Sequence, residues 1–229
     1  MLNLILILVV IVLSVQLFFT EEIKAVKERD PAAKNNFEII LLYSGLHAIV
    51  LYRVAHQLWE WKLPFFPRAL SQFGKFLTGI EIHPGAAIGK SLFIDHGMGV
   101  VIGETSIIGN NVTLFQGVTL GGTGKEIGKR HPTVGDNVVI GTGAKILGNI
   151  IIGHNSYIGA NAVVIRNVPA NATVVGVPGH IAKKDGKKID ITLDHADVSD
   201  PIMQNMARLL KRIKVLEEKI GDRDKGSEI

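Results

Sequence analysis

The chain has 229 residues, of which 25 are Gly and none is Cys, and its formal net charge at pH 7 is +4. The absence of Cys excludes a disulfide framework, a thiol nucleophile and a cysteine metal site, and it is compatible with a reducing cytoplasm. The excess of positive charge is too small to indicate a nucleic-acid partner, and the length suffices for one large domain or two small ones.

Residues 1–19 form an apolar segment without a charged side chain. The segment is about long enough to span a bilayer, but it lacks the basic start and the small-residue cleavage site of a secretory signal. Three interpretations stay open: a membrane anchor, an apolar helix docked in an oligomer, and sequence translated upstream of the true start. We favour the last, because the following residues have the pattern of a complete soluble protein. We then expect a cytoplasmic location, with a membrane-anchored one as the alternative.

Residues 20–78 have the pattern of a helical domain. Apolar spacing predicts one or two helices between residues 37 and 61 and a short helix over 68–77. Pro64 and Pro67 are expected to separate these helices, because the proline ring removes a backbone donor and clashes with the preceding turn.

From Ile82 to Pro169 the chain follows a period of six residues, in which an aliphatic residue returns at a fixed place. Six residues make one short strand plus one turn, and three such units make a triangular coil whose aliphatic side chains stack on those of the next coil. The period therefore predicts a mainly β fold, with a β-solenoid over residues 79–182. The alternative is a sandwich of ordinary short strands. The aliphatic positions are Ile82, Ile88, Ile94, Ile102, Ile108, Leu114, Leu120, Val134, Ile140, Ile146, Ile152, Ile158 and Val164.

Two interruptions break this period. Ile94 and Ile102 are eight residues apart, and Leu120 and Val134 are fourteen apart. Insertions in a solenoid become loops on one face, which is often the binding face. We therefore expect the chemistry of the protein at these two breaks.

His96, at the first break, is the leading catalytic candidate. A His side chain is the usual general base at neutral pH, and such a base needs a carboxylate to fix its tautomer. Asp95 is adjacent, and Glu81 lies near one coil back. A surface His in a turn is the alternative, and the register break beside His96 disfavours it.

The second break begins with a Gly-rich stretch, residues 121–124, and ends at Arg130 and His131. Arg matches a carboxylate bidentately, and exposed backbone N–H groups suit an oxyanion or a phosphate. The stretch is not a Walker A motif, because Lys125 is not followed by Ser or Thr.

A zinc site is a further alternative, because some left-handed solenoids bind zinc through three histidines. The available histidines are His83, His96, His131 and His154. Asp95 beside His96 and Arg130 beside His131 favour recognition of a zwitterion, so no metal is expected. The same clustering disfavours a non-catalytic scaffold.

The end of the chain, residues 183–229, has the pattern of a polar linker, an exposed helix over 201–220, and a tail that ends in Ile229.

These motifs resemble serine O-acetyltransferase, a family of hexapeptide-repeat acyltransferases. They run in family order from about residue 20 to residue 182. They include Arg29-Asp30-Pro31-Ala32, and the more specific combination is the helical N-terminal domain with Asp95-His96, Gly121-Gly122-Thr123-Gly124-Lys125 and Arg130-His131-Pro132. The resemblance implies a left-handed parallel β-helix that assembles into trimers, with active sites between neighbouring solenoids, and often into hexamers.

The implied reaction is acetyl transfer from acetyl-CoA to the hydroxyl of L-serine, which gives O-acetylserine for cysteine synthesis. Acetyl-CoA would be a co-substrate, with no permanently bound cofactor. Another hydroxyl acceptor, homoserine or a sugar, is the alternative. His96 would take the hydroxyl proton, and Glu81 would orient His96 from a position where the family more often has Asp. The residues implied to bind acetyl-CoA are Gly122, Thr123, Thr142, Lys145 and Ala160.

The resemblance also assigns the binding of serine. Asp30 and Asp95 would hold its amino group, Arg130 would pair with its carboxylate, and His131 would complete the pocket. Many family members end in Ile, which inserts into the active site of O-acetylserine sulfhydrylase. The resemblance therefore implies that Ile229 anchors this partner.

Overall fold

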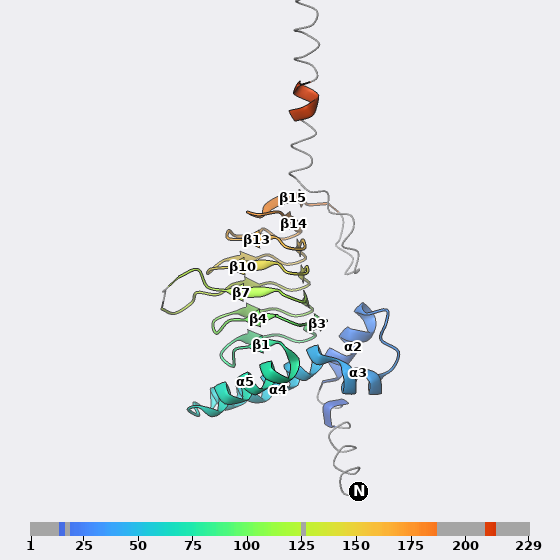
Figure 1. The fold of residues 1–229 in the computed structure, drawn as a ribbon, viewed down its shortest axis with the longest axis vertical. Helices are drawn as coiled ribbons and strands as arrows, with labels where there is room; N and C mark the ends of the chain where they lie inside the picture. Colours follow the sequence, from blue (N-terminus) through green and yellow to red (C-terminus); the bar gives the residue numbers. More distant parts are fainter. Residues whose placement is uncertain (1–13, 17–18, 125–126, 187–208, 214–229) are drawn as a thin grey trace, which may run out of the picture.

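The computed structural model describes residues 14–16, 19–124, 127–186 and 209–213. A helical region covers one end of a three-sided solenoid of short strands (Figure 1). The helices are α2 (Thr20–Arg29), α3 (Asn36–Leu42), α4 (Ser44–Glu60) and α5 (Phe66–Thr78). The strands follow from β1 to β15, with the β1 end of the solenoid resting on α4 and α5.

The solenoid has three faces, each a sheet whose parallel strands come from successive coils. The first face holds β1 (Glu81–Ile82), β4 (Val101–Ile102), β7 (Thr119–Gly121), β10 (Lys145–Leu147) and β13 (Val163–Val164). The second holds β2 (Ala87–Ile88), β5 (Ile107–Ile108), β8 (Thr133–Val134) and β11 (Ile151–Ile152). The third holds β3 (Phe93–Asp95), β6 (Thr113–Phe115), β9 (Val139–Ile140), β12 (Tyr157–Ile158), β14 (Ala172–Val175) and β15 (His180–Lys184).

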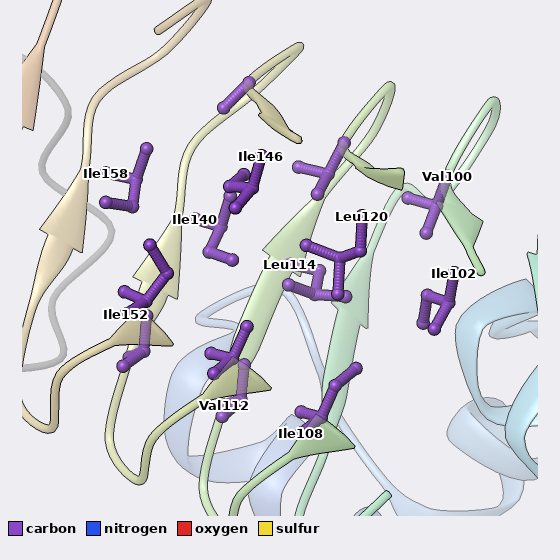
Figure 2. Close-up of a cluster of buried hydrophobic side chains, with 14 of the residues drawn as sticks. Val100, Ile102, Ile108, Val112, Leu114, Leu120, Ile140, Ile146, Ile152 and Ile158 are labelled. Carbon is purple, nitrogen blue, oxygen red and sulfur yellow. The ribbon is translucent and has the colours of Figure 1, made fainter. Parts of the chain in front are cut away.

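The aliphatic positions of the six-residue period form the core of the coils, as predicted. Figure 2 shows these side chains stacked between the faces. Burial of one such side chain contributes about 1.5–3 kcal/mol, so the stack accounts for much of the stability of the solenoid. Those with no exposed surface include Ile102, Leu114, Leu120, Ile140, Ile146, Ile152 and Ile158.

The register of the first face shows that both breaks are insertions into an eighteen-residue coil. Val101 pairs with Thr119, eighteen positions later. Glu81 pairs with Val101, twenty positions later, because the first break adds two residues. Thr119 pairs with Lys145, twenty-six positions later, because the second break adds eight. The predicted solenoid and the place of both insertions are confirmed.

The two ends of the solenoid are closed differently. At the far end, β15 turns back and pairs antiparallel with β14, whereas the strands of neighbouring coils pair in parallel. All five residues of β15 are exposed. At the near end, the α4 residues Ala48, Ile49 and Tyr52 belong to the same buried cluster as the first coil.

The apolar run forms two helices, α3 and α4, which are bent by 69° at Tyr43, and this agrees with the expectation of one or two helices. One helix boundary differs from the expectation. Helix α5 begins at Phe66 and contains Pro67 in its first turn. A backbone N–H in the first turn has no acceptor within the helix, so its absence in proline costs no hydrogen bond. Pro67 therefore starts a helix and does not end one. Of the helix predicted over 201–220, only residues 209–213 are described, and they are helical.

Among the described residues, no single helix has the length and apolar character that a membrane span requires, although the bent pair α3–α4 passes that test when the two helices are taken together. The apolar segment 1–19 falls mostly outside the described residues, so its role and the cytoplasmic location stay predictions.

Candidate active site

His96 lies where the third face turns into the first. We call this turn, residues 95–99, the His96 corner. The His96 side chain is 74% exposed, and its Nε2 lies 3.9 Å from Oδ1 of Asp95, which is 16% exposed. The backbone of His96 is left-handed, with φ of 56°, and Gly97 follows with φ of 79°. The tight turn thus places an exposed imidazole beside a mostly buried carboxylate.

The start of α4 packs directly against this corner. A Cβ on Gly45 would lie 2.1 Å from the carbonyl oxygen of Ile94, so only glycine permits this approach. The Ser44 hydroxyl donates to the carbonyl oxygen of His96 at 3.3 Å. Helix α4 therefore supports the backbone that carries the candidate base.

Asp30 reaches the same region from the end of α2. The preceding residue, Arg29, is 6% exposed, and its guanidinium donates to the Thr113 hydroxyl at 3.1 Å and to the Val112 carbonyl oxygen at 3.2 Å. Burial lowers the pKa of Arg29 to about 10, which still leaves it charged at neutral pH. Arg29 thus anchors the end of α2 to the second coil and fixes the position of Asp30.

Tyr43, at the bend between α3 and α4, contacts Asp30 and lies within electrostatic reach of Asp95. Its hydroxyl donates to Oδ2 of Asp30 at 2.7 Å, while Oδ1 of Asp30 accepts the Ala32 N–H at 2.7 Å. Burial raises the pKa of Tyr43, and the hydrogen bond to Asp30 and the charge of Asp95 raise it further. Asp30 and Asp95 therefore both lie within electrostatic reach of one hydroxyl. Sequence reasoning missed Tyr43, because a Tyr between two apolar helices has the pattern of a packed residue.

Glu81, on β1, has a partner on α5. Its Oε2 lies 2.6 Å from Nζ of Lys75, and this hydrogen bond is the main cause that holds the pKa of Glu81 below its usual value. Glu81 is thus a carboxylate at neutral pH. Its orientation of His96 stays a prediction.

Arg130 and His131 lie where the first face turns into the second, against Glu104 and Thr105 of the coil below. We call these four residues the Arg130 corner. Nη2 of Arg130 lies 2.5 Å from Oε2 of Glu104. The Thr105 hydroxyl oxygen accepts the backbone N–H groups of Arg130 at 3.0 Å and His131 at 3.1 Å.

The imidazole of His131 is held in one tautomer. Its Nδ1 accepts the backbone N–H of Thr105 at 3.1 Å, which leaves the proton of the neutral ring on Nε2. His131 is 8% exposed, and burial is the first cause that lowers its pKa, followed by the charge of Arg130. Gly103 leaves room for the ring, since a Cβ there would lie 2.1 Å from Cδ2 of His131.

The two corners lie at opposite edges of the first face. The chain between them, residues 100–103, includes β4 and spans on the order of 13 Å when extended. Within one solenoid, the predicted base and the predicted carboxylate-binding Arg130 are therefore not brought together.

The residues predicted to bind acetyl-CoA fall into two groups, one in the coils above the His96 corner and one beside the Arg130 corner. Thr142 and Ala160 lie above His96 in the turns from the third face to the first, and Lys145 begins the next strand of the first face and donates to the carbonyl oxygen of Gly117. A ladder joins these turns: Gly117 N–H donates to Met98 O at 2.9 Å, Gly143 N–H to Gln116 O at 2.8 Å, and Asn161 N–H to Thr142 O at 2.7 Å.

Gly122 and Thr123 leave the first face on the side of the Arg130 corner, and both are exposed. A Cβ on Gly122 would lie 3.4 Å from the carbonyl oxygen of Arg130, and one on Gly148 would lie 3.3 Å from Cγ2 of Thr123. The glycine-rich stretch thus lies next to the Arg130 corner.

In the part of the chain that the structure describes, no three His, Cys, Asp or Glu side chains form a group that could hold a metal ion. Three of the histidines named above use Nδ1 to accept a backbone N–H: His83 from Gly85 at 3.0 Å, His131 from Thr105, and His154 from Asp136 at 2.9 Å.

Comparison with known proteins identifies the family. Residues 131–166 match the model of the bacterial transferase hexapeptide (six repeats). The chain is 57% identical over 194 residues to a serine acetyltransferase of Staphylococcus aureus, which covers 85% of this chain and 91% of that protein. It is 56% identical over 203 residues to a serine acetyltransferase of Bacillus subtilis, with 89% and 94% covered.

A solved structure gives the same result. The crystal structure of the Neisseria gonorrhoeae serine acetyltransferase in complex with serine superposes with a TM-score of 0.71 at 42% identity, covering 74% of this chain and 69% of that one. The identities over most of both chains, the parallel solenoid and the helical region agree, and the chain belongs to the serine acetyltransferase family of hexapeptide-repeat transferases.

Proposed function

We propose that this chain, as a serine acetyltransferase, transfers the acetyl group of acetyl-CoA to the hydroxyl of L-serine at a site that two subunits build together. The observation that carries the proposal is the division of the site residues between two edges of one face. The His96 corner holds the base and the carboxylates, whereas the Arg130 corner holds the cationic residues. A cyclic trimer, in which each His96 corner meets the Arg130 corner of the next subunit, would complete three equal sites.

The two corners together suit a zwitterion. Asp30 and Asp95 supply negative charge for the ammonium group of serine, and the guanidinium of Arg130 supplies a planar pair of donors for its carboxylate. Glu104 already holds this guanidinium at 2.5 Å, so it orients the fork in the absence of serine. The neutral His131 offers its Nε2–H as a further donor.

The reaction needs one proton transfer each way. His96 takes the proton of the serine hydroxyl while the oxygen attacks the thioester carbonyl carbon, and negative charge collects on the carbonyl oxygen. The exposed backbone at Gly122 and Thr123 offers N–H donors for this oxyanion. When the carbon–sulfur bond breaks, the CoA thiolate receives the proton from His96. Glu81, ionised through Lys75, stabilises the protonated imidazole in this scheme.

A sugar acceptor fits these residues poorly, because a sugar offers neither the ammonium nor the carboxylate that the two corners match. Homoserine carries both groups but is one methylene longer. A site that discriminates between substrates differing by one methylene does so by a factor of roughly 10 to 200 in kcat/KM. We therefore expect L-serine to be preferred over homoserine and sugars to be inactive.

Release of free thiol from acetyl-CoA tests the proposal. The wild-type protein is assayed with L-serine, L-homoserine and a panel of sugars, and the expected result is thiol release that depends on L-serine. His96→Ala should lower kcat by about 100-fold to 10,000-fold, the range of general base catalysis. The matched control is His154→Ala, an exposed His on another coil, which should keep full activity. Full activity in His96→Ala would sink the mechanism.

The predicted partner O-acetylserine sulfhydrylase and the pairing of trimers into hexamers are further parts of the proposal. Ile229 lies outside the described residues, so only its place at the carboxyl terminus supports it. Deletion of Ile229 should abolish co-elution with the sulfhydrylase while leaving serine acetylation intact. Unchanged co-elution would end this part of the proposal.

A further inference from the structure

We propose that the hydroxyl oxygen of Tyr43 is the third acceptor for the ammonium group of the substrate, beside the carboxylates of Asp30 and Asp95. This inference rests on the proposed function, because it assigns a residue to the amino group of serine. It makes Tyr43 a residue that selects acceptors with a free ammonium group.

The place of Tyr43 in the fold supports this role. The residue occupies the 69° bend between α3 and α4, with an extended backbone at φ of −85° and ψ of 103°. The next residue, Ser44, donates to the carbonyl oxygen of His96, so the bend lies against the His96 corner. Tyr43 is half-buried, and its hydroxyl meets Oδ2 of Asp30 at 2.7 Å.

The hydrogen-bonding capacity of these groups matches an ammonium. A primary ammonium has three N–H donors and no acceptor. The two carboxylates can each accept one of these donors. The Tyr43 hydroxyl donates its single hydrogen to Asp30, so the lone pairs of its oxygen can accept the third N–H of the ammonium group. Burial, Asp30 and Asp95 raise the pKa of Tyr43, so the phenol keeps its hydrogen at neutral pH and holds this orientation.

A purely supporting role is the competing explanation, in which Tyr43 acts only by orienting Asp30. The two roles differ when Asp30 is already changed. A residue that acts only through Asp30 has no further effect in an Asp30→Ala background, which removes the acceptor of the Tyr43 hydrogen bond, whereas a direct acceptor of the ammonium group still has one. A double-mutant cycle therefore separates them.

The experiment measures the KM of L-serine and the KM of acetyl-CoA by thiol release for wild type, Tyr43→Phe, Asp30→Ala and the double variant. Tyr43→Phe should raise the KM of L-serine about tenfold, as expected for a lost hydrogen bond to a charged group, without raising the KM of acetyl-CoA. The double variant should show a further rise of several-fold over Asp30→Ala. The control is Tyr52→Phe. Tyr52 lies farther along α4, its hydroxyl donates a buried hydrogen bond to the Ala86 carbonyl oxygen, and its loss should leave the KM of L-serine unchanged.

Each outcome decides the inference. An unchanged KM of L-serine in Tyr43→Phe, or a double variant equal to Asp30→Ala, overturns the direct contact. If the Asp30→Ala background is too slow to assay, the Kd of L-serine from titration calorimetry replaces its KM in all four proteins of the cycle. A wild-type protein that releases no thiol with L-serine would refute the proposed function itself, and this result is distinct from a failure of Tyr43 alone.

Discussion

Mixing two inactive variants tests whether one site is shared between subunits. His96→Ala destroys the His96 corner and Arg130→Ala destroys the Arg130 corner, and the first face keeps these corners apart within one chain. In an equal mixture of the two variants, a shared site is intact when an Arg130→Ala subunit supplies His96 and its neighbour, a His96→Ala subunit, supplies Arg130. Random assembly into cyclic trimers makes about one site in four intact.

The assay is serine-dependent thiol release after the two variants are unfolded together and refolded. We expect about a quarter of wild-type activity, whereas sites confined to single chains would show no gain over the separate variants. A matched control mixes wild type with a chain that carries both substitutions. Shared sites again leave about one in four intact, but sites within single chains leave about one in two. No recovery in the first mixture would refute the division of the site.

Four further variants test the packing and the titration of the fold. Gly45→Ala should lower the free energy of unfolding in urea by about 1–3 kcal/mol, because the new Cβ would lie 2.1 Å from the carbonyl oxygen of Ile94. Gly74→Ala, which has its nearest neighbour at 3.4 Å, should instead raise it by up to about 1 kcal/mol, and the opposite order would contradict the packing of α4. Leu120→Ala should cost about 2–5 kcal/mol in the same measurement, and a cost below that range would argue against a tightly packed coil core. Burial lowers the pKa of His83 from 6.5 to about 4, so the unfolded chain takes up the proton first and stability falls as the pH drops across that interval. His83→Gln should flatten this fall in thermal unfolding, and an equally steep fall would show that another group causes it.

The solenoid could be predicted from the sequence because its coils repeat. Aliphatic residues such as Ile140 must recur at a fixed spacing to stack on those of neighbouring coils, so the period predicts both the strands and the core. The same logic located both insertions, since a break in a strict period is visible without a structure. The helical region has no such repeat, so the bounds of its helices are harder to predict. Pro67 is an example, because a proline begins a helix when it lies in the first turn and ends one when it lies farther along.

The grouping of the site residues could be predicted only in part. His96 and Arg130 were found because each lies beside a break, but the sequence does not say that the breaks emerge at different corners. That follows from the strand register, which depends on the length of every turn. The contact between Tyr43 and Asp30 joins residues of separate helices, and the pairing of Glu81 with Lys75 depends on how α5 meets β1. Neither contact has a local sequence signal.

The reversed strand β15 also bears on how large an assembly of this chain can become. A coil with parallel strands exposes backbone groups at its last turn, onto which a further coil could add in the same direction, and such growth would end in filaments. Here the last turn is occupied by a strand from the same chain that runs the opposite way and carries Lys183 and Lys184 on exposed positions. The helices occupy the other end. On the third face, a further coil therefore finds no open strand edge that runs in the direction of the coils.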